Sequence, residues 1–150
     1  MKAFQDYYAE EFSHCYGCGK SNADGLHVKS YWDGDETVCH YTPEPFHTGG
    51  FPRNVYGGLL AALMDCHGNG TAAAAKYKAE GREMGTEPNI RFVTAQLNIS
   101  FLKPTPIGVE LEIRAEITEV KERKVIMNLY VIAKGEVCVK GTMVAVQLPA

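Results

Sequence analysis

The chain has 150 residues, of which 45% are hydrophobic and 22% are charged. These are ordinary values for a globular protein, and the length fits a single domain with its own core. The net charge is −3 and the chain has no dense run of lysine and arginine, so we expect no nucleic-acid partner. The longest apolar run, residues 59–64, is too short to cross a bilayer, so we expect no membrane partner.

The five cysteines are an odd number and are scattered, which argues against a disulfide framework. The first residues also lack the apolar core of a secretory signal. We therefore expect a reduced, cytoplasmic protein. Cys15 and Cys18 have the spacing of a metal or redox pair, but no second such pair follows and no βαβ pattern surrounds them. We expect no metal there, with a zinc site as the weaker alternative.

The first third of the chain predicts short elements joined by loops. The aromatic residues of segment 1–12 lie near helical spacing and favour a short amphipathic helix, followed by a tight loop over 13–24. Residues 26–31 and 36–41 look like two strands around a turn at 33–35. The prolines and paired glycines of residues 43–54 are typical of a loop.

The rest of the chain predicts one helix and then a sheet. The helix covers residues 57–80, although Gly68 and Gly70 weaken its middle. After a loop at 83–89, apolar and polar residues alternate in four strand-like runs. These runs cover residues 90–102, 110–120, 125–134 and 136–147. Short turns between the last three indicate an antiparallel meander. The fold class is therefore α+β, with an antiparallel sheet wrapped around one long central helix.

The start of this helix carries the clearest chemical signal. Gly57 and Gly58 precede an apolar run that ends at Asp65, which is the only Asp, Glu, Lys or Arg between Asn54 and Ala75. An isolated carboxylate on a buried helix is costly without a partner or a task. Glycines at a helix start expose backbone N–H groups that can receive negative charge. A base and an anion cradle on one element are parts that an acyl-transfer hydrolase needs.

Three motifs together resemble a known family. They are Tyr56-Gly57-Gly58 with Asp65, then Leu97-Asn98-Ile99-Ser100-Phe101-Leu102-Lys103-Pro104 with Gly108, and the leader Cys15-Tyr16-Gly17-Cys18-Gly19 with Asn22 and Gly25-Leu26. In this order they resemble the hotdog-fold acyl-CoA thioesterases of the phenylacetyl-CoA thioesterase-like group. The resemblance implies one hotdog domain over residues 1–150, with 1–24 as an N-terminal extension. It also implies an acyl-CoA substrate and no cofactor.

The resemblance also implies roles for individual residues. Asp65 would be the base or nucleophile that acts on the thioester, and the N–H of Gly57 or Gly58 would hold the carbonyl oxygen. Thr94 lies where related enzymes carry a Ser or Thr that helps to place the attacking water. Active sites of the family form between two subunits, so Asp65 of one chain would face Gly57 of the other. A homodimer, or a homotetramer built as a dimer of dimers, follows.

Two positions depart from the family pattern. Its histidine is Tyr56 here, which can donate a hydrogen bond but cannot act as a base at neutral pH. Its upstream asparagine has no clear match, and Asn54 or His47 is the candidate replacement. For the CoA phosphates, Arg91 and Lys103 are the candidate contacts.

Other interpretations stay open at this point. Asp65 could be a structural carboxylate, and the glycine pair could simply allow close packing. Cys66 and His67 suggest a nucleophile and base, but adjacent helical residues point about 100° apart and do not face each other. A non-catalytic dimer that binds acyl-CoA or a small apolar ligand is the alternative function. Residues 44–52 also resemble the approach loop of hotdog dehydratases, but Gly50 stands where those enzymes have their histidine.

Overall fold

The computed structural model describes residues 1–149. Two short 3-10 turns, η1 (Phe4–Tyr7) and η2 (Glu10–Phe12), open the chain. The remaining elements are one helix, α1 (Gly57–Ala79), and six strands. The strands are β1 (Ser30–Asp33), β2 (Glu36–Tyr41), β3 (Phe92–Phe101), β4 (Leu111–Val120), β5 (Lys124–Ala133) and β6 (Glu136–Gln147). Within residues 1–149, no helix is both long and apolar enough to span a membrane.

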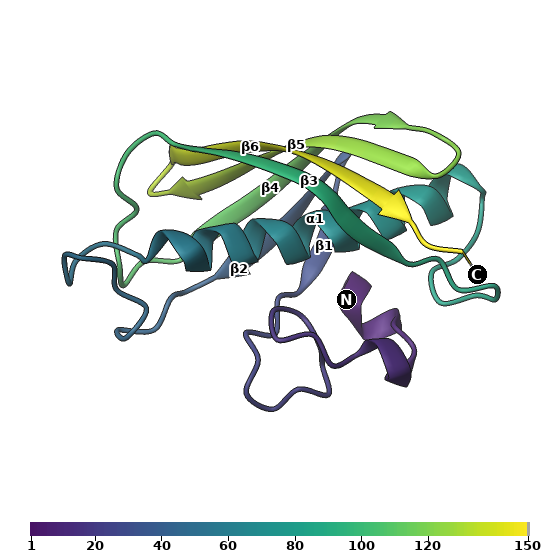
Figure 1. Ribbon diagram of the computed structural model, residues 1–150, viewed down its shortest axis with the longest axis horizontal. Coiled ribbons are helices and arrows are strands. Elements are labelled where there is room, and N and C mark those ends of the chain that lie inside the picture. The colour runs from purple at the N-terminus through teal and green to yellow at the C-terminus, as the bar shows by residue number, and fades with distance from the viewer. Residues whose placement is uncertain (150) are drawn as a thin grey trace.

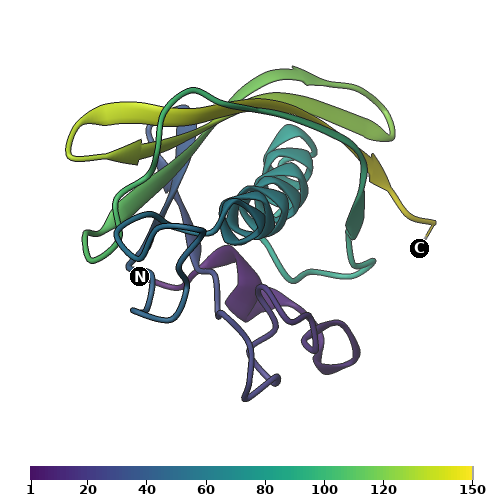
Figure 2. The ribbon, with the colours of Figure 1, turned by 60° about the vertical axis from the view of Figure 1, so that its left-hand side comes forward.

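The six strands form one antiparallel sheet in the order β1-β2-β4-β5-β6-β3. The sheet arches over α1, which runs along its concave face (Figures 1 and 2). The expected α+β class and hotdog arrangement are confirmed, as is the meander of β4, β5 and β6. Strand β3 does not continue that meander, because it pairs with β6 at the far edge of the sheet.

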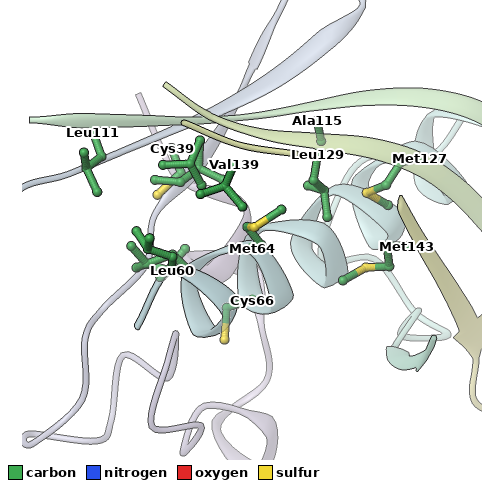
Figure 3. Packing of buried hydrophobic residues seen from close by; sticks show 14 of the residues in the cluster. Cys39, Leu60, Met64, Cys66, Leu111, Ala115, Met127, Leu129, Val139 and Met143 are labelled. Atoms are coloured by element: carbon green, nitrogen blue, oxygen red, sulfur yellow. The ribbon is translucent and has the colours of Figure 1, made fainter. Parts of the chain in front are cut away.

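The core lies between α1 and the concave face of the sheet. Met64 of the helix packs toward the sheet, and Leu129 and Met143 reach down from it (Figure 3). The side chains of all three are completely or almost completely inaccessible to solvent. Burial of this many large apolar groups is the main source of stability, at about 1.5–3 kcal/mol for each side chain. Cys66 points the other way, away from the sheet.

Residues 1–24, called the N-terminal segment below, pack against α1 from the side opposite the sheet (Figures 1 and 2). The expected helix over residues 1–12 is wrong, because Tyr8 and Ala9 have extended backbones that separate the two 3-10 turns. A helix this short is marginal by itself, and Phe4 and Gln5 of η1 are buried in the interior. The segment therefore belongs to the core of the domain.

A chain of buried polar groups fixes this segment to the helix. Gln5 exchanges hydrogen bonds with Ser30, from Nε2 to Oγ at 3.0 Å and from the Ser30 N–H to Oε1 at 2.8 Å. Ser30 Oγ lies 2.8 Å from His67 Nδ1, and Thr37 Oγ1 lies 3.1 Å from His67 Nε2. Thr37 then contacts Thr71 at 2.6 Å. All five side chains are fully buried, so each depends on its neighbours for its hydrogen bonds.

The first strand begins four residues later than the sequence pattern predicts. The N–H groups of Leu26 and Val28 donate to the carbonyl oxygens of Tyr16 and Gly17 in the leader loop, at 2.8 and 2.9 Å. His27 between them has a left-handed backbone with φ of 56°, which a regular strand does not accept. Contacts with the leader loop therefore replace strand pairing until Ser30.

Candidate active site

Asp65 lies on α1 and is held by a side chain from the sheet. The hydroxyl of Thr94 on β3 donates a short hydrogen bond to Asp65 Oδ1. Asn69, one turn further along the helix, donates from Nδ2 to Thr94 Oγ1 at 2.8 Å. Because Asn69 occupies the acceptor side of the hydroxyl, the proton of Thr94 is directed at Asp65. Within residues 1–149, Oδ2 of Asp65 accepts no hydrogen bond.

A break in the regularity of β3 brings Thr94 to this position. The pairing of β3 with β6 shifts register between Thr94 and Gln96. Before the shift the half-buried residues are Phe92 and Thr94, and after it they are Leu97 and Ile99. One inserted residue therefore changes which positions face the helix, as a β-bulge does. The bulge directs the hydroxyl of Thr94 onto α1.

A pocket of about 300 Å³ opens beside this carboxylate. Its walls come mainly from residues 7–18, from α1 and from residues 84–93, and its polar lining includes Asp65, Asn69, Asn89 and Arg91. The aromatic residues that the N-terminal segment contributes to the pocket wall are Tyr7, Tyr8 and Phe12. A mostly apolar cavity with a few convergent polar groups is typical of a site for a small molecule.

The start of the helix is a second, separate group of candidate residues. The first N–H groups of a helix have no acceptor inside it, and no side chain caps α1 at Tyr56. The Tyr56 ring lies over Gly58, where a Cβ atom would come within 2.5 Å of it. Gly58 therefore makes room for the ring, and Tyr56 itself remains 58% exposed. Gly57 and Asp65 are eight residues apart, which is about 12 Å along a helix.

The two upstream candidates flank this helix start. The carbonyl oxygen of His47 accepts from the N–H of Tyr56 at 2.9 Å, and its Nδ1 accepts from the N–H of Glu44 at 2.9 Å. Asn54 connects to the same loop through its backbone, with its carbonyl oxygen accepting from the N–H of Gly49 at 2.9 Å. Both residues shape the entry into α1, away from the Asp65 pocket.

The two candidate phosphate contacts lie in different places. Arg91 lines the Asp65 pocket, and its guanidinium stacks on the ring of Phe12 at 4.1 Å from the centroid. Lys103 follows β3 on the surface and forms an ion pair with Glu136. Of the two, only Arg91 is placed beside the carboxylate.

Cys66 and His67 face different surroundings, as their adjacent positions in a helix predict. His67 belongs to the buried network with Ser30 and Thr37, and burial lowers its pKa to about 3. Cys66 Sγ lies 3.7 Å from the sulfur of Cys15 in the leader loop. The neighbouring Cys66 thiol lowers the pKa of the Cys18 thiol. All five cysteines are free.

Sequence reasoning missed two features of this site. Asn69 was overlooked, although its place four residues after Asp65 on an otherwise apolar helix is a readable signal. The contribution of the N-terminal segment to the pocket was also missed. Nothing in the sequence indicates which side of the helix residues 7–12 would cover.

Comparisons with known proteins define the class. The model of the thioesterase superfamily matches residues 53–140, and the chain belongs to this superfamily. A thioesterase superfamily protein from Shewanella loihica is 45% identical, with a TM-score of 0.71, and the match covers 95% of this chain and 100% of that one. The predicted family is confirmed. No curated protein matches the chain.

More distant structures share the fold. The PaaI protein of E. coli, from the phenylacetic acid degradation operon, is 14% identical with a TM-score of 0.67, covering 83% of this chain and 82% of that one. A Streptococcus mutans protein bound to acetyl CoA is 13% identical with a TM-score of 0.65, covering 81% and 88%. At these identities the likeness concerns the fold alone.

Proposed function

We propose that this protein hydrolyses acyl-CoA thioesters. The observation that carries the proposal is the carboxylate of Asp65, fixed by Thr94 at the wall of an apolar pocket. Membership of the thioesterase superfamily supports the reaction class. The similar fold of the Streptococcus mutans protein bound to acetyl CoA supports the substrate class. The aromatic walls of the pocket favour an apolar or aromatic acyl group.

The chemistry follows from the atoms of Asp65. The oxygen that Thr94 leaves free takes a proton from water as that water attacks the thioester carbonyl carbon; alternatively, the carboxylate attacks the carbon itself. The carbonyl oxygen gains negative charge, and the N–H of Gly57 or Gly58 at a helix start stabilises it. In the first route the C–S bond then breaks and Asp65 returns its proton to the leaving sulfur, which gives the free acid and the CoA thiol. In the second route C–S cleavage releases CoA and leaves a mixed anhydride on Asp65, which water hydrolyses to the free acid.

We further propose that two chains complete each site. Within one chain, Gly57 and Asp65 are about 12 Å apart along α1, too far to act on one carbonyl group. Strand β3 is an edge of the sheet, with Val93 and Phe101 exposed. Thr94 near the start of β3 contacts Asp65, and Phe101 at its end lies beside Gly57.

This layout predicts how two copies would meet. If two β3 edges pair antiparallel about a twofold axis between Leu97 and Asn98, Thr94 of one chain comes opposite Phe101 of the other. Asp65 of one chain then approaches Gly57 of its partner on both sides of a twofold axis. A homodimer with two shared sites is the minimal active form, and a dimer of dimers would preserve both.

The test is release of free thiol from a panel of aromatic, short, medium and long acyl-CoAs. We expect turnover of at least one class, and a fall of about 10²- to 10⁴-fold in Asp65→Asn, because the amide cannot take up the proton. Equal turnover by wild type and variant would contradict the assignment of Asp65. Binding of acyl-CoA without turnover by the wild type would instead identify a ligand-binding protein, the alternative that Tyr56 in place of the histidine favours.

A further inference from the structure

Three thiols from two distant parts of the chain meet beside the pocket. Cys15 and Cys18 come from the leader loop, and Cys66 comes from α1, immediately after Asp65. Their sulfur atoms all lie within 4.8 Å of one another. We propose that these three cysteines bind one thiophilic divalent cation, Zn²⁺ foremost, which fixes the leader loop to the helix.

The spacing of the sulfurs fits a metal better than a disulfide. In tetrahedral zinc sites the Zn–S bond is about 2.3 Å, which puts neighbouring sulfurs about 3.8 Å apart. The Sγ atoms of Cys15 and Cys66 are 3.7 Å apart. A disulfide requires an S–S bond of about 2.05 Å. In the sequence, Cys15 and Cys18 have no further cysteine nearby. The fold brings a third thiol to them, Cys66 of α1.

The backbone around the thiols is arranged to hold them. The N–H of Gly17 donates to Cys15 Sγ at 3.3 Å and so fixes this sulfur within the loop. A Cβ atom at Gly17 would lie 2.2 Å from Cys66 Sγ, so only glycine lets the loop approach the helix this closely. A Cβ atom at Gly19 would meet the backbone of Ser13 and Cys15 at 2.4 Å. Both glycines keep the loop tight around the sulfurs.

The donor set selects the ion. Thiolates are soft ligands, which prefer zinc or copper(I) to magnesium or calcium. Binding of Zn²⁺ by three thiols releases three protons and leaves a site of net charge −1 with its fourth position open. Cys15, Cys18 and Cys66 all line the Asp65 pocket, so the bound ion would form part of the pocket wall. The ion would fix the wall formed by the N-terminal segment. This proposal does not depend on thioester hydrolysis.

The test is metal content of tag-free protein, purified in reductant and loaded with Zn²⁺ before exhaustive dialysis. We expect inductively coupled plasma mass spectrometry to find about one zinc ion per chain. That ion should be lost in each of Cys15→Ala, Cys18→Ala and Cys66→Ala. The matched control is Cys138→Ala, which removes a buried thiol on β6 outside the cluster and should retain the zinc. Circular dichroism reports whether each variant is folded.

A second measurement needs no variant. Titration of the reduced wild type with Co²⁺ should give thiolate-to-cobalt charge-transfer absorption that saturates at about one ion per chain and disappears when Zn²⁺ is added. Absence of this absorption, or zinc content that is equal in wild type and Cys66→Ala, would overturn the proposal. A disulfide between Cys15 and either partner in protein kept under reductant would overturn it as well.

Discussion

At the scale of single residues, hydrogen bonding fixes the orientation of the Asp65 carboxylate. Its neighbour Thr94 accepts a hydrogen bond from Asn69 at 2.8 Å and donates one from its own hydroxyl to Oδ1. The hydroxyl therefore has only one orientation, and the carboxylate is held with its second oxygen available. We regard Thr94 and Asn69 as positioning residues, because neither needs to touch the reacting atoms.

Substitution of Thr94 tests this role. Thr94→Val keeps the size of the side chain but removes the hydroxyl, so we expect kcat to fall about 10- to 100-fold, the effect of losing one hydrogen bond to a charged group. Thr94→Ser retains the hydroxyl and should restore most of the rate. Steady-state thiol release measures both, and equal rates for the Val and Ser variants would contradict the positioning role.

His67 has a different task on the opposite side of the same helix. It is fully buried, with both ring nitrogens in contact with hydroxyl groups. Burial is the main reason that its pKa falls to about 3 from the ordinary 6.5. As the pH falls below 6.5, the unfolded chain gains a proton that the folded chain does not bind. The folded state therefore loses stability in acid.

The size of that loss can be measured. Between about pH 7.5 and pH 5.0, this one group should lower the free energy of unfolding by about 2 kcal/mol. Urea unfolding at both pH values measures it in the wild type, and His67→Gln serves as the reference because it lacks the titrating ring. The variant should show a smaller acid-induced loss. Parallel pH profiles for the two proteins would contradict a buried, neutral His67.

At the scale of elements, α1 contains two glycines that lower its helix propensity but allow other segments to pack closely against it. A Cβ atom at Gly68 would come within 2.4 Å of Met143 Sδ on β6. A Cβ atom at Gly70 would come within 2.6 Å of Gln5 Nε2. The helix thus gives up about 1 kcal/mol of helix propensity at each position. In return, the sheet packs closely on one side and the N-terminal segment on the other.

A pair of substitutions separates propensity from packing. Gly70→Ala should destabilise the protein by about 1–3 kcal/mol, because it displaces Gln5 and leaves buried polar groups unpaired. In a Gln5→Ala background the same change should become neutral or stabilising by up to about 1 kcal/mol, because only helix propensity remains. Urea unfolding of the wild type, the two single variants and the double variant measures the free energies of unfolding for this double-mutant cycle. Additive effects would show that Gly70 and Gln5 are not coupled.

Most elements were predictable because their signals are local. The apolar helix from Gly57 and the alternating strands β4 to β6 follow from periodicity and turns, and their ends agree within a residue or two. The place of β3 beside β6 and the bulge after Thr94 depend on contacts between distant strands. The alternation of apolar and polar residues within a strand does not predict these contacts. The late start of β1 likewise depends on the leader loop, which binds Leu26 and Val28 first.

At the scale of the whole molecule, the candidate site consists of two halves on one helix. The Asp65 half adjoins the pocket, and the Gly57 half lies beside Phe101 at the other end of β3. The sequence predicts Asp65, Thr94 and Gly57 as members of these halves through their resemblance to a family, but not Asn69. It could not place the N-terminal segment, which forms one wall of the pocket and brings Cys15 and Cys18 to Cys66. That wall arises from tertiary packing, through Gln5 and the leader loop.

Each proposed site combines residues of two chains, and a variant at each half can test this. Gly57→Pro removes an N–H at the first helical position, where proline is well tolerated. Tyr56 already has the extended backbone, with ψ of 125°, that a residue before proline prefers. Each of Gly57→Pro and Asp65→Asn should be severely impaired as a homodimer of two chains of 16.5 kDa.

The most direct measurement is thiol release by a purified heterodimer, obtained by co-expression with two different tags, of one Asp65→Asn chain and one Gly57→Pro chain. In this heterodimer one of the two shared sites carries both altered residues, and the other carries neither. We predict about half of the wild-type activity, since one of two sites is intact. Activity no higher than that of the two impaired homodimers would contradict a site shared between chains.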